Sequence, residues 1–391
     1  MKDYNDYLNY SRKMYDVYMS MSVLNWDMET YMPKNGNTFR AQQLSTLANI
    51  AYDLATDSKY GTLLEKLLAS NSLSPDQKRN VYLSNKEFLK KKKYSSEFIQ
   101  RESNLISKAF KDWRIAKEKN DFSLFRESLK DIVELRKEEV ELLGYINHPY
   151  DVLLDKYEPN LTTNDVDLIF NDVKDYLVPF ITKITQNNKI DDSFFYQNFD
   201  WQKQWDFGIE LLKQMGYDFD SGRQDISAHP FSSHFSPEDA RVTTRIDKNN
   251  LSEMIWSCIH EGGHALYEQG LLAENYGTPL GNSISLGIHE SQSRLWENHI
   301  GRSLSYWKNN FTLLKSYFPE KLKNVDCKMF YNACNNVKSS FIRTNADELT
   351  YHLHVLIRYE IEKGLIEGSI KVDELPFIWN NLYKKYLNID V

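Results

Sequence analysis

Two histidines four residues apart flank a glutamate in the stretch His-Glu-Gly-Gly-His, which begins at His260. On an α-helix this spacing places the imidazoles of His260 and His264 on one face, one turn apart, where both can bind a single ion. Glu261 lies beside the first histidine, from where its carboxylate can reach a water on that ion without binding the ion itself. This HExxH motif predicts a metal-dependent peptidase, with Glu261 as the catalytic base.

The residues around the motif have the pattern of the helix that it requires. Apolar side chains recur at three- and four-residue spacing over residues 251–267, and Gly270 fits the position that ends a helix. Gly262 and Gly263 lie inside this helix, where each costs about 1 kcal/mol relative to alanine. We therefore expect another backbone, or a substrate, to approach closely there. Cys258 lies on a different face and is expected to be a buried thiol.

A catalytic zinc ion needs a third protein ligand and one open position for water. Residues 289–298 predict a helix with Glu290 and Arg294 on one face, and a loop over 271–285 connects it to the first motif. A helix, a loop and an antiparallel helix would bring Glu290 back beside the histidines. A carboxylate ligand would give the metal a harder character than a thiolate. The alternative is that Glu290 is a surface carboxylate paired with Arg294.

The rest of the sequence predicts a mainly α-helical protein. One helix is expected over 122–143, stopping at Gly144, and helices resume at Ser252. The segment 220–250 contains glycine, proline and an alternating apolar stretch, which predict a short β-sheet. No internal repeat or low-complexity linker divides the chain. We therefore expect a single domain over residues 1–391, with an N-terminal helical subregion at about 1–145 and a catalytic subregion at about 146–391.

Composition narrows the class of protein. The net charge of -7 argues against a general nucleic-acid binder, and the basic run at 90–93 fits a solvated helix end. The three cysteines fit neither a zinc knuckle nor a disulfide framework, so a reducing cytoplasm is the expected location. The N-terminus is polar, unlike a signal peptide, and no apolar run is long enough to span a bilayer. We expect neither a nucleic acid nor a membrane as partner.

The two motif segments resemble the thermostable carboxypeptidase Taq family of metallocarboxypeptidases. They read His-Glu-Gly-Gly-His-Ala-Leu-Tyr-Glu-Gln-Gly at 260–270 and His-Glu-Ser-Gln-Ser-Arg-Leu-Trp-Glu-Asn at 289–298. Further matching segments are Trp26-Asp27, Met32-Pro33, Arg40–Leu44, His148–Asp151, Tyr157–Pro159, Ala228–Phe231, Asp239–Arg245 and Ile342–Tyr351. The resemblance covers essentially the whole chain, and several motifs in one order make it specific.

The resemblance implies a site and an activity. His260, His264 and Glu290 would be the ligands of one zinc ion per chain, with Glu261 as the general base; cobalt or manganese could also occupy such a site. The fold would be a large helical zincin-type metallopeptidase with a central substrate groove, commonly a homodimer. Family members remove single residues from free peptide C-termini with broad specificity. An oligopeptidase is the alternative within the same class.

The resemblance also predicts a difference from the family. Its members continue beyond the stretch that ends at Val391, with a Gln-Asp-x-His-Trp and a Phe-Gly-Tyr-Phe segment near the substrate, so this chain is expected to be C-terminally truncated. That expectation motivates an alternative from another class, a catalytically impaired paralogue that acts as a metal-stabilised scaffold. The intact motif residues weigh against this alternative.

An enzyme that acts on peptide C-termini must recognise a free carboxylate, and the fork of an arginine suits both oxygens. Arg343 is the first candidate, and Arg241 and Arg245 follow; pairing with neighbouring acidic residues is the structural alternative for all three. His229 and His289 are candidates for binding substrate or for orienting the ligands. Asp239 is a candidate for orienting a ligand histidine through its distal ring nitrogen.

Overall fold

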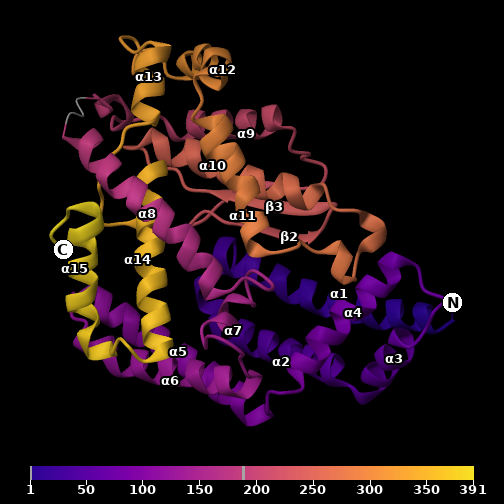
Figure 1. Cartoon of the computed structure of the whole chain (residues 1–391). Coiled ribbons are helices and arrows are strands. Elements are labelled where there is room, and N and C mark those ends of the chain that lie inside the picture. The colour runs from indigo at the N-terminus through magenta and orange to yellow at the C-terminus, as the bar shows by residue number, and fades with distance from the viewer. Residues whose placement is uncertain (1, 187–189) are drawn as a thin grey trace. The chain divides into compact units, whose positions relative to one another are not determined.

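The computed structural model describes residues 2–186 and 190–391. Within these residues the protein is mainly helical and contains one small three-stranded sheet, which confirms the predicted fold class (Figure 1). The chain divides into two compact units, each made of separate segments. The first contains residues 1–92 and 191–334, and the second contains residues 93–190 and 335–391. The single domain with subregions divided near residue 145 stays a prediction.

The first unit holds the sheet and the helices that carry the HExxH motif. Its helices are α1 (Lys2–Thr30), α2 (Asn37–Thr56), α3 (Ser58–Leu68), α4 (Pro75–Lys91), α9 (Trp201–Met215), α10 (Leu251–Gln269), α11 (Leu286–Arg294), α12 (Leu304–Tyr317) and α13 (Cys327–Cys334). Short 3-10 turns lie at Lys34–Gly36, Ser193–Phe195, Ala273–Asn275 and Pro279–Gly281, and a π-helix, Leu295–Gly301, directly continues α11.

The sheet lies where alternation predicted it. Its strands are β1 (Gln224–Ile226), β2 (Ser232–Ser236) and β3 (Asp239–Thr244). The central strand β3 pairs parallel with β1 and antiparallel with β2. The register of β2 against β3 shifts between His234 and Ser236, and such an irregularity locally redirects a side chain. Helix α10 packs against both β2 and β3, so the sheet supports the motif helix.

The largest hydrophobic core holds α10 in place. The helix starts after Asn250, whose side chain accepts a hydrogen bond from the backbone N–H of Ser252 and so caps it. The apolar face predicted from periodicity is buried, and Cys258 is 1% exposed, as expected of a buried thiol. Burial raises the pKa of the Cys258 thiol to about 12. This face packs in one cluster with side chains of α9 and α12, among them Leu212 and Trp307.

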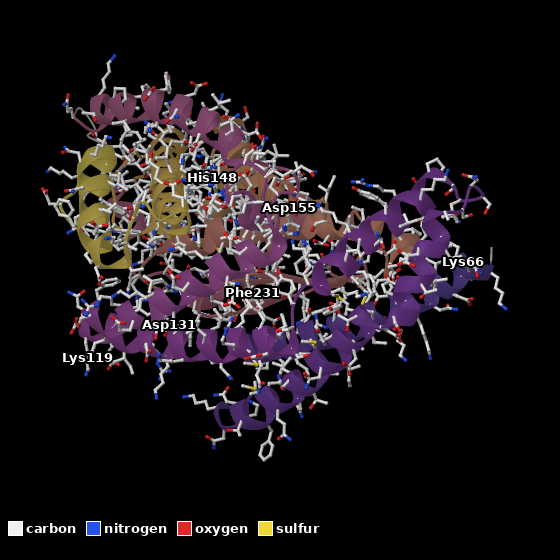
Figure 2. All side chains as sticks on the ribbon, turned by 60° about the horizontal axis from the view of Figure 1, so that its bottom comes forward. Lys66, Lys119, Asp131, His148, Asp155 and Phe231 are labelled. Atoms are coloured by element: carbon white, nitrogen blue, oxygen red, sulfur yellow. The ribbon has the colours of Figure 1, made fainter. Side chains whose placement is uncertain are left out.

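The second unit is a helical assembly. Its helices are α5 (Ser96–Lys119), α6 (Ser123–Leu143), α7 (Asp151–Leu154), α8 (Thr163–Thr185), α14 (Glu348–Glu367) and α15 (Leu375–Leu387), with 3-10 turns at Arg343–Asn345 and Val372–Glu374. Helices α5 and α6 pack along each other; Figure 2 labels Lys119 at the end of α5 and Asp131 on α6. Helix α6 ends at Gly144, as predicted, where φ is +76°. No helix in the described parts of the chain is both long and apolar enough to cross a bilayer.

Candidate metal centre

The side chains of His260, His264 and Glu290 meet at one point, between α10 and α11. The Oε2 atom of Glu290 lies 3.2 Å from Nε2 of His264 and 3.6 Å from Nε2 of His260. The three potential ligand atoms all lie within 4.8 Å of one another. Ligand atoms about 2 Å from a tetrahedral zinc ion are about 3.3 Å apart, so this donor set fits such an ion.

The group is open on one side. The Glu290 side chain is 40% exposed, whereas those of His260 and His264 are 19% and 12% exposed. Two imidazoles and one carboxylate leave a four-coordinate ion one free position, which is the arrangement of a catalytic rather than a structural site. The geometry can therefore hold a metal ion and still admit water or a substrate oxygen.

Each histidine is fixed through the ring nitrogen that faces away from the centre. Nδ1 of His260 lies 2.8 Å from Oε2 of Glu297, and Nδ1 of His264 lies 3.1 Å from the backbone carbonyl oxygen of His289. Both acceptors require a proton on Nδ1, which leaves Nε2 free to bind metal. Glu297 lies in the π-helix that continues α11 and was not singled out from the sequence. Its spacing of seven residues from Glu290, two helical turns, was the available signal.

The role expected of Asp239 falls to Glu297. Both oxygens of Asp239 accept hydrogen bonds from Arg241, at 2.8 and 2.9 Å. The two residues are separated by one position on β3, so their side chains lie on the same face of the strand. The expectation that Asp239 orients a ligand histidine was wrong, because the arginine beside it takes both carboxylate oxygens.

The Glu290 carboxylate is aimed by its own helix. Nε of Arg294 donates to Oε1 at 2.9 Å, which leaves Oε2 turned toward the histidines. The buried Ser293 hydroxyl lies 3.1 Å from Oε2 and donates its proton to the Glu290 backbone carbonyl oxygen at 2.7 Å. Burial raises the pKa of Glu290, but hydrogen bonding to His264 and the charges of His260 and Arg294 outweigh it and lower the pKa to about 2. Glu290 therefore pairs with Arg294, as the alternative proposed, and at the same time lies beside the two histidines.

Glu261 is in a different environment from the other carboxylates. It is 7% exposed, and burial raises its pKa, although the neighbouring His260 and His264 act in the opposite direction. Burial lowers the pKa of His260, but the hydrogen bond to Glu297 and the surrounding carboxylates outweigh it and raise the pKa. A buried carboxylate beside a metal-binding group, with its pKa moved toward neutrality, is suited to accepting a proton.

Of the two glycines of the motif, Gly263 has the close backbone contact that was predicted and Gly262 does not. A Cβ atom on Gly263 would lie 2.7 Å from Cα of Ser293 and 2.9 Å from the carbonyl oxygen of Gln292, so the backbone of α11 occupies that space. A Cβ atom on Gly262 would instead meet the ends of two flexible side chains of α9, Leu212 and Met215. Gly263 therefore sets the approach of α11, and with it the position of Glu290.

The candidate substrate-binding residues have different surroundings. Arg241 forms an ion pair with Asp239 and lies 4.5 Å from the ring centre of Trp26. Nη1 of Arg343 donates to the hydroxyl of Tyr351 at 2.7 Å within the second unit. The side chain of His229 is exposed. The ring of His289 stacks on that of His264, with 4.5 Å between ring centres, so His289 contacts a candidate ligand directly.

Sequence and structure comparisons identify relatives over the whole chain. Residues 6–391 match the family model described as carboxypeptidase Taq (M32) metallopeptidase. Carboxypeptidase 1 of Bacillus subtilis is 39% identical over 372 residues, which are 95% of this chain and 74% of that protein.

Solved structures agree with the family match. The structure described as "The Structure of CHT" is 48% identical with a TM-score of 0.97, and an M32 carboxypeptidase from Deinococcus radiodurans is 34% identical with a TM-score of 0.98. In both, this chain is covered completely and spans 79% of the other chain. The chain therefore belongs to the carboxypeptidase Taq (M32) family of metallopeptidases and is a peptidase of the hydrolase class.

Proposed function

We propose that the protein is a zinc-dependent metallocarboxypeptidase that removes single residues from free peptide C-termini with broad specificity. The observation that carries this proposal is the convergence of two imidazole Nε2 atoms and one Glu290 oxygen, open on one side and next to the buried Glu261. In this proposal His260, His264 and Glu290 hold the ion, and Glu261 is the base. We propose zinc because imidazole and carboxylate ligands suit it. Cobalt or manganese could occupy the same three ligands.

In this proposal each residue around the metal position has a separate role in catalysis. A divalent ion at this position supplies Lewis acidity toward the scissile carbonyl and toward water. Glu261 accepts a proton from the attacking water and returns it to the leaving amine. Glu297 and the His289 carbonyl oxygen keep both ligand rings in the tautomer that presents Nε2. Arg294 keeps Glu290 turned toward the ion.

We propose Arg343 as the group that recognises the substrate's terminal carboxylate. No carboxylate of the described residues forms an ion pair with Arg343, whereas Arg241 is already held by Asp239. A guanidinium with free donors can bind both oxygens of a carboxylate, which a lysine ammonium cannot match. Arg343→Lys should raise KM for peptides with a free C-terminus by about tenfold or more, with kcat less affected. An unchanged KM would exclude this role.

The test of the proposed function is an assay of C-terminal release. The 391-residue chain, loaded with zinc or cobalt, is mixed with an N-blocked peptide beside the Glu261→Gln variant, and freed amino acids are quantified. The parent should release the last residue, the variant should bind metal without releasing it, and amidation of the peptide should abolish release. Internal cleavage of the amidated peptide would favour an oligopeptidase. Bound metal without any release would favour the scaffold alternative.

We also propose that the protein is a homodimer, which the resemblance implies, and that it lies in the cytoplasm, which its cysteine content favours. Among the described residues the three cysteines, Cys258, Cys327 and Cys334, are free, which fits a reducing compartment. Sedimentation analysis of the purified chain tests the dimer, and fractionation of cells that express it tests the location. A monomer at micromolar concentration, or recovery outside the cytoplasm, would overturn the corresponding proposal.

A further inference from the structure

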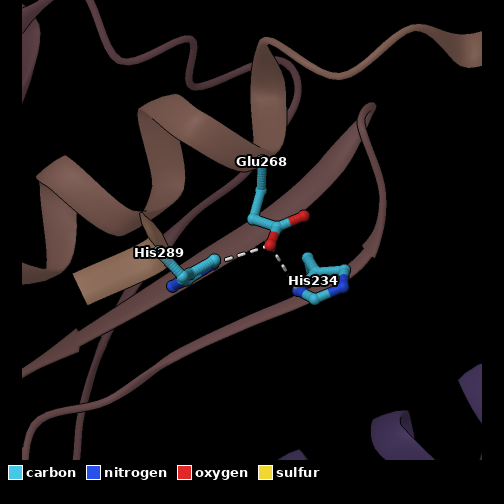
Figure 3. Close-up of side chains that lie close together, drawn as sticks. All are labelled: His234, Glu268 and His289. Atoms are coloured by element: carbon cyan, nitrogen blue, oxygen red, sulfur yellow. Dashed lines mark hydrogen bonds and ion pairs between the residues drawn. The ribbon is translucent and has the colours of Figure 1, made fainter. Parts of the chain in front are cut away.

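A second group of side chains with metal-binding atoms lies close to the first. His234 comes from β2, Glu268 from the last turn of α10 and His289 from the first half of α11 (Figure 3). One nitrogen of each histidine and one oxygen of the glutamate lie within 4.8 Å of one another. No residue belongs to both groups, so the second group is a separate cluster and not an extension of the first.

The second cluster is as compact as the first. Oε1 of Glu268 lies 2.7 Å from Nε2 of His289 and 3.3 Å from Nδ1 of His234. Figure 3 shows both rings approaching the same carboxylate oxygen from different elements. These separations are near the spacing of about 3.3 Å between ligands of a tetrahedral zinc ion. The three atoms are therefore close enough to one another to serve as ligands of one ion.

The charge in this cluster is not balanced by a fixed cation. Glu268 is 2% exposed, and among the described residues its only ion-pairing partners are His234 and His289. The buried Glu297, by contrast, is paired with both Arg294 and Arg302. A carboxylate removed from water is costly unless a positive charge accompanies it. A divalent cation between the histidines would supply that charge.

An ion could reach this cluster from solvent. The His234 side chain is 33% exposed and lines a pocket of about 390 Å³ within the first unit, together with Tyr15, Lys91 and Thr278. The shift in strand register lies at His234, so the strand is irregular where this side chain leaves it. The pocket gives room for water to complete the coordination of an ion, as an open site requires.

We propose that His234, Glu268 and His289 form a second binding site for a divalent transition-metal cation such as zinc. The site is separate from the catalytic centre but linked to it through His289. The ring of His289 stacks on His264, and its carbonyl oxygen accepts the hydrogen bond from Nδ1 of His264. A cation held by the His289 ring therefore fixes the residue that orients a catalytic ligand. Its role is positional, and it takes no part in the chemistry.

The test is the number of zinc ions that the chain binds tightly. The 391-residue chain is stripped of metal and titrated with zinc in competition with a chromophoric chelator. The parent should bind two ions per chain, and His234→Gln and Glu268→Gln should each bind one. His299→Gln is the matched control, because this histidine belongs to neither group, and it should still bind two. Circular dichroism of each variant before titration confirms that the fold is retained.

A fourth variant separates this proposal from the proposed function. His260→Gln removes a ligand of the first site, and among the described residues His260 has no hydrogen-bonding or ion-pairing partner in the second cluster. This variant should therefore bind one zinc ion per chain. The double variant that also carries His234→Gln should bind none. If the parent binds one ion and His234→Gln retains it, the three side chains are only a hydrogen-bonded cluster and the proposal is overturned. If His260→Gln leaves two ions bound, the first site is misassigned instead.

Discussion

The two candidate ligand histidines differ in what holds them. His264 donates to a backbone carbonyl, whereas His260 donates to Glu297, a buried carboxylate that is also paired with Arg294 and Arg302. Burial raises the pKa of Glu297, but the hydrogen bond from His260 and the arginine charges lower it to about 2. Hydrogen bonds to an ionised acceptor are about twice as strong as neutral ones. The orientation of His260 therefore depends on one side chain that is not itself a ligand.

Glu297→Gln should weaken zinc binding at the first site by about 10- to 100-fold, while the fold is retained. The amide keeps the size of the side chain but removes its charge, so the hydrogen bond from His260 becomes weaker. Zinc affinity is measured by competition with a chelator at fixed pH. Glu261→Gln is the control, because it changes an adjacent buried carboxylate that accepts no hydrogen bond from a ligand ring. Equal affinities for parent and Glu297→Gln would show that Glu297 does not support His260.

At this scale the sequence predicted the principal residues and misassigned one supporting residue. The four-residue spacing of His260 and His264 is local, so their common face could be predicted without a structure. The separation of Asp239 and Arg241 on a strand is also local, and it should have indicated a pair on one face. The cluster of His234, Glu268 and His289 joins three elements, and no spacing along the chain indicates it.

The packing of α10 on α11 determines where Glu290 lies. The backbones approach at Gly263, where an added Cβ would lie 2.7 Å from Cα of Ser293, and the neighbouring Gly262 faces side chains of α9 instead. An added methyl group can be accommodated by moving a flexible side chain but not by moving a packed helix without cost. The two adjacent glycines thus provide a matched pair for testing the helix contact.

Gly263→Ala should destabilise the protein by about 1–3 kcal/mol and weaken zinc binding, because α11 must move away and carry Glu290 with it. Gly262→Ala should cost less, since alanine favours the helix by about 1 kcal/mol and the side chains of Leu212 and Met215 can shift. Urea unfolding and zinc titration measure both effects. Similar zinc affinities for the two variants would show that the close approach at Gly263 does not position the ligand.

Helix α6 carries a buried carboxylate whose partners come from α6 itself, from the segment before α5 and from the segment after α7. Glu139 on α6 is 2% exposed and accepts hydrogen bonds from Tyr94 at 2.7 Å, Arg136 at 2.7 Å and Lys156 at 2.5 Å. Burial raises the pKa of Glu139, but the bonds from Lys156, Tyr94 and Arg136 outweigh it and lower the pKa. The stabilisation is therefore complete above the pKa of the unfolded state and is lost as pH falls through the folded pKa.

Glu139→Gln should destabilise the protein by about 1–3 kcal/mol near pH 7, because Lys156 loses the charge of its carboxylate partner while Arg136 keeps its ion pair with Glu102. The difference from the parent should begin to shrink as pH falls below the ordinary glutamate pKa of about 4.3 and should disappear as pH falls through the lowered pKa of folded Glu139. Urea midpoints measured by circular dichroism from pH 3 to 8 give the profile. Glu138→Gln, one residue away with a side chain 51% exposed, is the control and should change little. A pH-independent difference would contradict the linkage.

Element boundaries were predictable where the signal is local. Helix α6 ends at Gly144, a glycine with a positive φ. Helix α10 starts after Asn250, which caps it. The π-helix Leu295–Gly301 and the register shift at His234 were not predicted. Both depend on the packing of neighbouring elements rather than on the propensities of their own residues. Two of the residues that the sequence did not indicate, Glu297 and His234, lie on these irregular elements, whereas a third, Glu268, lies on the regular helix α10.

At the scale of the whole molecule, the candidate metal-binding residues of both clusters lie in one of the two units. All six residues of the two clusters lie within residues 234–290, inside the first unit. The chain passes from one unit to the other at residues 92–93, 190–191 and 334–335, so each unit is assembled from distant segments. A ligand that binds only the folded form stabilises it by about 2.7 kcal/mol at 100 times its Kd. That stabilisation should first appear in the segments that hold the ligands.

Hydrogen exchange with and without zinc should reveal this division. Zinc should slow exchange in α10, α11 and the π-helix by about tenfold or more, because opening these segments breaks the ligand set. Peptides from α5, α6 and α15 of the second unit, which hold none of the six residues, should exchange at unchanged rates. The double variant His260→Gln with His234→Gln is the control, in which zinc should have no effect. Slower exchange throughout both units would instead mean that they unfold together, and the metal would then stabilise the whole chain.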